Sequence, residues 1–188
     1  MLNLYVVRHG KTLFNEKHLI QGVCDSPLTD EGITQADHLH NRLQDIHFEA
    51  CYVSPLSRAE ATASHILKGK DIPVYENDNL SEFNFGSLEG DSEEKLRAIY
   101  PVLKGEHVDG FDGETMSHFT ERILAALDEI RDKFPDGNVL IVTHSGVITA
   151  LLNSIGTVSE KDTLRIDNCS ITRLIYTDTW KIAEISAK

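Results

Sequence analysis

The chain has 188 residues, of which 40% are hydrophobic and 26% are charged, a mixture typical of soluble globular proteins. At about 150 residues per domain, this length predicts a single domain over residues 1–188, with a core that needs no disulfide or metal. Thirty acidic residues outnumber eighteen lysines and arginines and give a formal net charge of −12. The molecule as a whole therefore repels nucleic acids and anionic membranes, and we expect neither as a partner.

The apolar stretches and the cysteines indicate a cytoplasmic protein. The longest aliphatic run covers residues 139–142, whereas a membrane span needs about twenty apolar residues. The N-terminus lacks the basic start and apolar core of a signal peptide. The three cysteines, Cys24, Cys51 and Cys169, are odd in number and form no metal-like cluster, which argues against a disulfide framework.

Strands and helices alternate along the first half of the chain. Residues 2–7 are an apolar, β-branched run typical of a strand. Thr29 then begins a helix with one apolar face. That face carries Ile33, Ala36, Leu39, His40 and Leu43. Residues 51–53 predict a second strand, an alanine-rich helix continues to about residue 67, and residues 73–75 predict a third strand.

The second half continues this alternation and ends in a hairpin. Ser117 is expected to cap a long helix that ends before Pro135, and residues 139–143 form a buried type of strand followed by a helix to residue 152. Residues 170–176 and 180–185 predict an antiparallel pair. The sequence therefore predicts an α/β fold, a three-layer sandwich with a mostly parallel sheet, helices on both faces and an antiparallel C-terminal hairpin.

Residues from about 82 to 113 interrupt the alternation. This stretch contains five glycines, several acids and one short helical candidate near residues 93–100. We interpret it as a short lid insertion over one end of the sheet, where specificity determinants often lie. Its acidic residues between 89 and 94 are interpreted as a solvated surface.

Basic and nucleophilic side chains follow three of the predicted strands. Arg8 and His9 follow the first strand, Arg58 lies just after the second, and His144 follows the fourth. Because sites in open α/β sheets form beyond the carboxyl ends of the strands, we expect two arginines and two histidines to meet there. Glu82 lies at the start of the insertion that would cover them.

These residue types suit a phosphate ester. Arginine binds the oxygens of a phosphate dianion through a planar fork that keeps its charge, and two arginines can neutralise the dianion. Neutral imidazole carries a lone pair near pH 7 and is a competent nucleophile. A poor alkoxide leaving group needs an acid, and Phe83 and Phe85 beside Glu82 are surroundings that raise the pKa of a carboxyl group.

A longer ordered set of short motifs covers nearly the whole chain. The set comprises Val7-Arg8-His9-Gly10-Lys11-Thr12 with Asn15, Gln21-Gly22 with Asp25-Ser26-Pro27-Leu28-Thr29, Gly32 with Gln35-Ala36, Ser54-Pro55-Leu56-Ser57-Arg58-Ala59 with Thr62-Ala63, Leu80-Ser81-Glu82 with Gly86 and Glu89-Gly90, Gly113-Glu114-Thr115, Val142-Thr143-His144-Ser145-Gly146, and Asn168 with Ser170-Ile171-Thr172. Together these motifs resemble the histidine phosphatase superfamily, the phosphoglycerate-mutase-like proteins. For the matching residues, the resemblance implies that His9 is the nucleophile, that Arg8, Arg58 and His144 form the phosphate pocket, and that Glu82 is the proton donor.

Further substrate-binding candidates lie in the same motifs. The resemblance places Asn15 in the phosphate pocket, and Gln21 and Gly22 belong to the matching set. The backbone N–H of Ser145 stands at a helix start, a position that favours an anion. One departure is Lys11, where the family most often has glutamate.

No cofactor and no metal site are predicted. The chain has no H-E-x-x-H or paired-cysteine signature, no Walker loop and no G-x-G-x-x-G motif. Ser145 fails as a nucleophile elbow because Thr143 and Val147 stand where the two glycines are required.

Three functions remain open at this stage. The first is a metal-independent phosphatase that hydrolyses small phosphate monoesters through a phosphohistidine. The second is a phosphoglycerate mutase. Mutases of this family, however, carry a Glu-Arg-His/Arg-Tyr-Gly run where this chain has Glu82-Phe83-Asn84-Phe85-Gly86. We also expect no tail after Ser186 that could close over the site. The third is a catalytically silent protein that binds a phospho-ligand or a partner, which predicts loss of residues that are all present. A small phosphorylated metabolite is the expected partner, and the oligomeric state stays open.

Overall fold

The computed structural model describes residues 1–103, 112–156 and 165–187. A six-stranded sheet with the order β3-β2-β4-β1-β5-β6 forms its centre. The strands are β1 (Leu2–Arg8), β2 (Ala50–Val53), β3 (Val74–Glu76), β4 (Gly137–Thr143), β5 (Ile171–Tyr176) and β6 (Trp180–Ala187). The first four run parallel to one another, whereas β5 runs antiparallel to both β1 and β6. The predicted α/β fold with a mostly parallel sheet and a C-terminal hairpin is confirmed.

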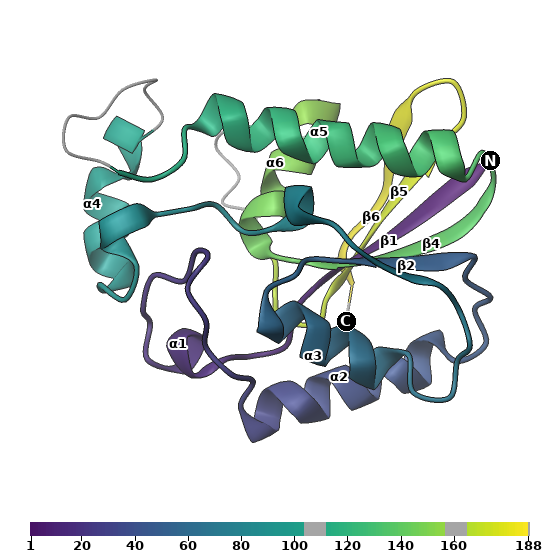
Figure 1. Ribbon diagram of the computed structural model, residues 1–188, viewed down its shortest axis with the longest axis horizontal. Coiled ribbons are helices and arrows are strands. Elements are labelled where there is room, and N and C mark those ends of the chain that lie inside the picture. Colours follow the sequence, from purple (N-terminus) through teal and green to yellow (C-terminus); the bar gives the residue numbers. More distant parts are fainter. Residues whose placement is uncertain (104–111, 157–164, 188) are drawn as a thin grey trace.

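Helices cover both faces of the sheet (Figure 1). On one side lie α2 (Asp30–Leu43) and α3 (Ser57–Ile66), and on the other lie α5 (Met116–Lys133) and α6 (Ser145–Ile155). Because side chains of a strand alternate between faces, neighbouring residues of β2 enter different cores: Cys51 packs among residues of α2 and α3, and Tyr52 packs among residues of α5 and α6. The three-layer arrangement follows from these two separate clusters.

The starts of two helices test the capping predictions. Thr29 caps α2 as expected, since its hydroxyl accepts the N–H of Gly32 at 3.1 Å. The predicted cap at Ser117 is wrong, because the hydroxyl of Thr115 accepts the N–H of His118 and α5 begins at Met116. The chain is already held in position before Thr115, where the N–H of Glu114 donates to the carbonyl of Asn84.

The described part of the 82–113 segment lies beyond the carboxyl ends of the parallel strands. It contains the short 3-10 helix η2 (Gly86–Leu88) and α4 (Glu93–Leu103), which confirms the helix expected near residues 93–100. The α4 helix lies at the same end of the molecule as the short helix α1 (Leu13–Glu16) (Figure 1). A bridge between Leu19 and Ser92 joins this segment to the loop after α1. Residues 104–111 of the predicted lid lie outside the described residues.

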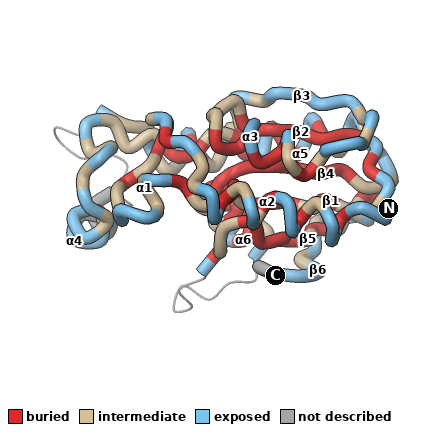
Figure 2. The backbone as a smooth tube through the Cα atoms, turned by 90° about the horizontal axis from the view of Figure 1, so that it is seen from below, coloured by how far each residue is buried: buried red, intermediate tan, exposed pale blue. Residues whose placement is uncertain are grey.

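Burial follows the layers (Figure 2). The central strands β2 and β4 are buried along most of their length, whereas the edge strand β3 and residues 93–98 of α4 are largely exposed. Among the helices in the described ranges, none has the length and apolar character needed to cross a membrane. All three cysteines are free.

Candidate active site

The register of β1 and β4 brings the two candidate histidines together. Arg8 at the end of β1 pairs with Thr143 at the end of β4, so His9 and His144 occupy the next position on adjacent strands. The N–H of His9 donates to the carbonyl of Thr143 at 2.9 Å, and the two imidazole ring centroids are 5.2 Å apart. The expectation that these strand ends would meet is confirmed.

His9 is arranged as a neutral imidazole with one free nitrogen. Its Nδ1 lies 2.8 Å from the carbonyl of Gly10, and because a carbonyl only accepts, Nδ1 must carry the hydrogen. The lone pair then resides on Nε2. Burial, together with the positive charges of Arg8 and Arg58, lowers the pKa of His9 well below its ordinary value. Such an imidazole stays unprotonated at neutral pH and can act as a nucleophile.

His144 presents a different arrangement in the same place. Its Nε2 lies 2.7 Å from the hydroxyl of Ser54, whereas its buried Nδ1 has no hydrogen-bond partner among the described residues. Burial and the charge of Arg58 lower the pKa of His144 well below its ordinary value. When the Ser54 hydroxyl donates to Nε2, the single proton of a neutral His144 resides on Nδ1. That N–H is then a donor available to a phosphoryl oxygen.

Two guanidinium groups supply positive charge at the histidines. Arg58 is only 1% exposed and donates to the carbonyls of Gly22 at 2.6 Å and Cys24 at 3.0 Å. Arg8 donates to the carbonyl of Ile166 at 2.6 Å. Carbonyls orient an arginine without cancelling its charge, and within the described ranges neither arginine has an ion pair with a carboxylate. Their buried Nε atoms also have no partner there, which makes this a site for an anion.

Glu82 lies in the coil after the 3-10 helix η1 (Asp78–Leu80). The carbonyl of Leu80 accepts the hydroxyl of Thr143 at 2.7 Å, which ties this coil to the end of β4. The carboxyl group is buried, and its two oxygens accept the N–H of Phe83 at 2.9 Å and of Gly146 at 3.0 Å. Burial raises the pKa of Glu82, although these two N–H groups and the nearby arginines oppose the shift. The expected direction of this pKa shift is confirmed.

Two amide side chains direct N–H groups to the same place. The Oδ1 of Asn15 accepts the N–H of Thr12 and the Nδ2 of Asn168, both at 3.2 Å, which leaves the Nδ2 of Asn15 available to a ligand. The Oε1 of Gln21 accepts the hydroxyl of Thr12 at 2.7 Å. Its buried Nε2 has no partner in the part of the chain that the structure describes. Both side chains are therefore placed to donate to an anion.

The remaining two candidates differ in position. Ser145 begins α6, and no side-chain cap occupies that helix N-terminus. Gly22 is buried and its carbonyl accepts from Arg58, so this glycine orients Arg58. A Cβ atom at Gly22 would lie 2.1 Å from Oε1 of Glu89, which explains why no side chain fits there.

A cavity of about 400 Å³ opens over these groups. Its polar wall comprises Arg8, His9, Asn15, Gln21, Glu82 and Ser145, together with Glu93, Arg97, Gly146, Thr149 and Asn153. Its apolar wall comprises Leu19, Ile20, Phe83, Phe85, Leu96, Met116, Phe119 and Ala150. Arg58 and His144 are buried behind these residues. Within the described ranges, no three histidine, cysteine or acidic side chains are placed to hold a metal ion together.

Comparison with known proteins identifies the family. The model of the histidine phosphatase superfamily (branch 1) matches residues 4–186. The chain belongs to this superfamily. It is 34% identical to the "Probable phosphoglycerate mutase GpmB" of Erwinia tasmaniensis, over 93% of this chain and 85% of that protein. It is 30% identical to the "Uncharacterized phosphatase PhoE" of Bacillus subtilis, over 98% of this chain and 94% of that protein.

A solved structure gives the same family and fold. The crystal structure of a phosphoglycerate mutase from Bacillus anthracis superposes with a TM-score of 0.87 at 32% identity. The match covers 99% of this chain and 93% of that one. The names of these histidine phosphatase relatives include both a phosphatase and mutases, so the family assignment leaves the reaction to be argued from the site.

Several supporting residues of this histidine phosphatase site were not assigned a role from the sequence. The Nδ2 of Asn168 donates to the carbonyl of His9 at 2.9 Å, and the hydroxyl of Thr62 accepts the N–H of Gly10 at 3.0 Å. Both residues belong to the matching motifs, but only the fold shows what they contact. Glu89, expected on a solvated surface, instead accepts the N–H groups of Val23 at 2.9 Å, Cys24 at 2.6 Å and Phe85 at 3.1 Å. That interpretation of Glu89 is corrected, because its carboxylate joins two loops of the site.

Proposed function

We propose that this protein is a metal-independent phosphatase that hydrolyses small phosphate monoesters through a phosphohistidine on His9. The observation that carries the proposal is the pair of arginines, Arg8 and Arg58, held by carbonyls without a carboxylate ion pair in the described ranges, beside a neutral His9 with a free Nε2. An unpaired buried charge is costly, and a bound phosphate dianion offsets that cost. Phosphoryl transfer then needs little more than positioning and electrostatics.

The first step transfers the phosphoryl group to the enzyme. The Nε2 of His9 forms a bond to phosphorus while the ester P–O bond breaks, and the protonated Glu82 gives its proton to the departing oxygen. Arg8, Arg58 and the Nδ1 of His144 stabilise the three equatorial oxygens. The alcohol leaves with a phosphohistidine and an ionised Glu82 behind.

The second step returns the enzyme to its starting state. The Glu82 carboxylate takes a proton from a water molecule as that water attacks phosphorus and the P–N bond breaks. Inorganic phosphate leaves, His9 is again neutral and Glu82 is again protonated. The same carboxyl group therefore acts as acid in the first step and as base in the second.

The apolar wall supports a choice of substrate. Phe83, Phe85, Met116 and Phe119 stand where the organic part of the ester would lie, and burying apolar surface there contributes about 25 cal/mol per Å². Arg97 on α4 is exposed and lies 3.8 Å from Glu93, so it is a weak partner for a substrate carboxylate. We therefore expect aryl and apolar alkyl phosphates to be better substrates than phosphoglycerates.

The same site argues for hydrolysis over isomerisation, which is the second candidate because of the mutase relatives. A mutase must keep its phosphohistidine from water while the intermediate turns over in the site. The Glu82-Phe83-Asn84-Phe85-Gly86 run supplies no arginine or tyrosine to hold a carboxylated intermediate.

The free cysteines support a cytoplasmic location. Burial raises the pKa of the Cys51 and Cys169 thiols to about 12.

One assay separates the two reactions. The enzyme is given 1-naphthyl phosphate and, separately, 3-phosphoglycerate with and without 2,3-bisphosphoglycerate, while inorganic phosphate and 2-phosphoglycerate are both followed, with and without a chelator. We expect phosphate release that the chelator does not affect and a higher kcat/KM for the naphthyl ester. Interconversion of the phosphoglycerates that outpaces phosphate release by orders of magnitude would establish the mutase instead.

A further inference from the structure

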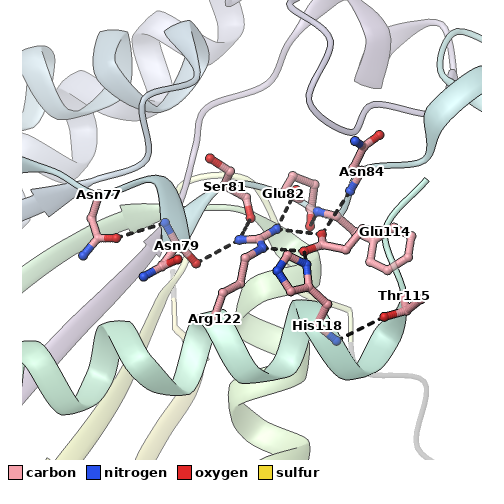
Figure 3. Close-up of polar contacts among 10 residues, drawn as sticks. Asn77, Asn79, Ser81, Glu82, Asn84, Glu114, Thr115, His118 and Arg122 are labelled. Carbon is pink, nitrogen blue, oxygen red and sulfur yellow. Dashed lines mark hydrogen bonds and ion pairs between the residues drawn. The ribbon is translucent and has the colours of Figure 1, made fainter. Parts of the chain in front are cut away.

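Arg122 on α5 fixes the backbone that carries Glu82 (Figure 3). Its side chain is 12% exposed, and its guanidinium group donates to three backbone carbonyls between η1 and Glu82. Nη1 donates to the carbonyls of Asn79 at 2.9 Å and Ser81 at 2.8 Å, and Nη2 donates to the carbonyl of Glu82 at 3.0 Å. One side chain thus satisfies the carbonyl of the candidate acid and two carbonyls that precede it.

Glu114 holds this guanidinium from the opposite side. Its carboxylate is bidentate, with 2.7 Å from Nε of Arg122 to Oε1 and 2.9 Å from Nη2 to Oε2, and its side chain is 7% exposed. The N–H of Asn84 also donates to Glu114, and the N–H of Glu114 donates back to the carbonyl of Asn84 at 2.8 Å. Figure 3 shows Arg122 and Glu114 side by side against the coil that bears Glu82.

This coil is held by side chains and not by a backbone ladder. Residues 82–85 belong to neither a helix nor a strand, so no regular backbone ladder sets their position. The carboxyl oxygens of Glu82 are held by Phe83 and Gly146, but these contacts persist only while the Cα atom of Glu82 stays in place. Arginine suits this role because its rigid fork binds several acceptors in fixed directions, which a lysine does not.

We propose that Arg122, oriented by Glu114, is a positioning residue that sets the Glu82 carboxyl group for proton transfer to the leaving oxygen. This inference rests on the proposed function, in which Glu82 is the general acid. Arg122 does not line the cavity, and its hydrogen bonds reach the site through the backbone that bears Glu82. Together with burial, its charge also lowers the pKa of His144, an effect that Arg122→Lys retains. Its loss should therefore affect those substrates whose leaving group needs a proton.

The test compares two substrates in Arg122→Gln and Arg122→Lys. One substrate is a simple alkyl phosphate, and the other is p-nitrophenyl phosphate, whose phenolate leaves without a proton. General acid catalysis is worth about 10²–10⁴-fold, so misplacing the acid should lower kcat/KM for the alkyl ester at least about tenfold. The kcat/KM for the aryl ester should fall less than about threefold, because kcat/KM reports only the steps up to departure of the alcohol and not the later step in which Glu82 acts as base. Inhibition by inorganic phosphate should not change. Lysine keeps the charge but not the fork, so its variant should resemble Arg122→Gln.

Two further variants guard against a purely structural effect. Arg131→Gln changes an arginine on the same helix that pairs with Asp128 and Asp132 on the surface, and it should leave both substrates unaffected. Glu114→Gln keeps Arg122 but weakens its orientation, and it should lower the alkyl reaction selectively. Should Arg122→Gln fail to fold, as judged by circular dichroism, Arg122→Lys and Glu114→Gln carry the same comparison.

Glu82→Gln separates failure of this inference from failure of the proposed function. Suppose Glu82→Gln lowers kcat/KM selectively for the alkyl ester, while the Arg122 and Glu114 variants lower kcat/KM equally for both substrates or not at all. That result would overturn the positioning role and leave Glu82 as the acid. An equal loss of kcat/KM on both substrates in Glu82→Gln would overturn both the acid role of Glu82 and the inference. The inference also requires that adding Arg122→Gln to Glu82→Gln leaves the ratio of kcat/KM for the alkyl ester to kcat/KM for the aryl ester unchanged.

Discussion

At the scale of single residues, the proposed chemistry depends on which protonation states burial favours. Burial lowers the pKa of His9 and raises that of Glu82, because in both groups it disfavours the charged form. Both shifts act in the direction that favours a neutral base and a protonated acid in one cavity. Free solution offers this combination poorly, since a carboxyl group there ionises before an imidazole loses its proton.

The pH dependence of the alkyl reaction should report Glu82. Only its protonated form donates, and its pKa in the folded protein is above the ordinary 4.5. The ratio of wild-type to Glu82→Gln kcat/KM on an alkyl phosphate should therefore fall as the pH rises through that raised pKa, and substrate ionisation cancels in this ratio. On p-nitrophenyl phosphate the ratio should stay flat. A ratio on the alkyl ester that does not vary with pH would remove Glu82 as the acid.

At the scale of the elements, the loop after β1 sits directly on the start of α2. A Cβ atom at Gly10 would lie 2.6 Å from the carbonyl oxygen of Gly32, and a Cβ atom at Gly32 would lie 2.2 Å from that of Lys11. Both clashes are with backbone, so a side chain at either position requires the loop to shift. Since His9 lies in this loop, packing against α2 and the position of the nucleophile are coupled.

Gly32→Ala should therefore reduce both stability and activity. A forced backbone shift costs about 1–3 kcal/mol, more than the ~1 kcal/mol that alanine gains over glycine in a helix. We expect a lower free energy of unfolding in urea and a lower kcat. The control is His38→Ala, an exposed position of the same helix, which should be close to neutral. A Gly32→Ala variant as stable and active as His38→Ala would show that the close approach has no such effect.

What the sequence predicts at this scale depends on the range of the interactions. Local pattern was enough to place β1, β4 and the Thr29 cap, and the strand-end rule was enough to bring His9 and His144 together. The cap of α5 was misplaced because Asn84, distant along the chain, fixes the residue before Thr115. The contacts of Glu89 with Val23 and Cys24 were missed for the same reason. Such contacts between loops leave no periodic signal.

At the scale of the whole molecule, the net charge of the chain is opposite in sign to the local charge of the site. The chain carries a net charge of −12, yet its cavity is backed by two arginines that lack carboxylate ion pairs within the described ranges. We therefore expect an anionic ligand to be selected by a short-range arrangement at the strand ends and not to be attracted by the protein as a whole. The single domain over residues 1–188 with a lid at about 82–113 stays a prediction.

The most direct test of the account is the covalent state of His9 during turnover. In a rapid quench with an ester labelled on phosphorus, acid-labile label should appear on His9 within the first turnover and vanish as substrate is consumed. His9→Ala should take up no label and release no phosphate, whereas His47→Ala, at an exposed histidine, should behave as the wild type. Label on another residue, turnover without any label, or full activity in His9→Ala would contradict the phosphohistidine mechanism.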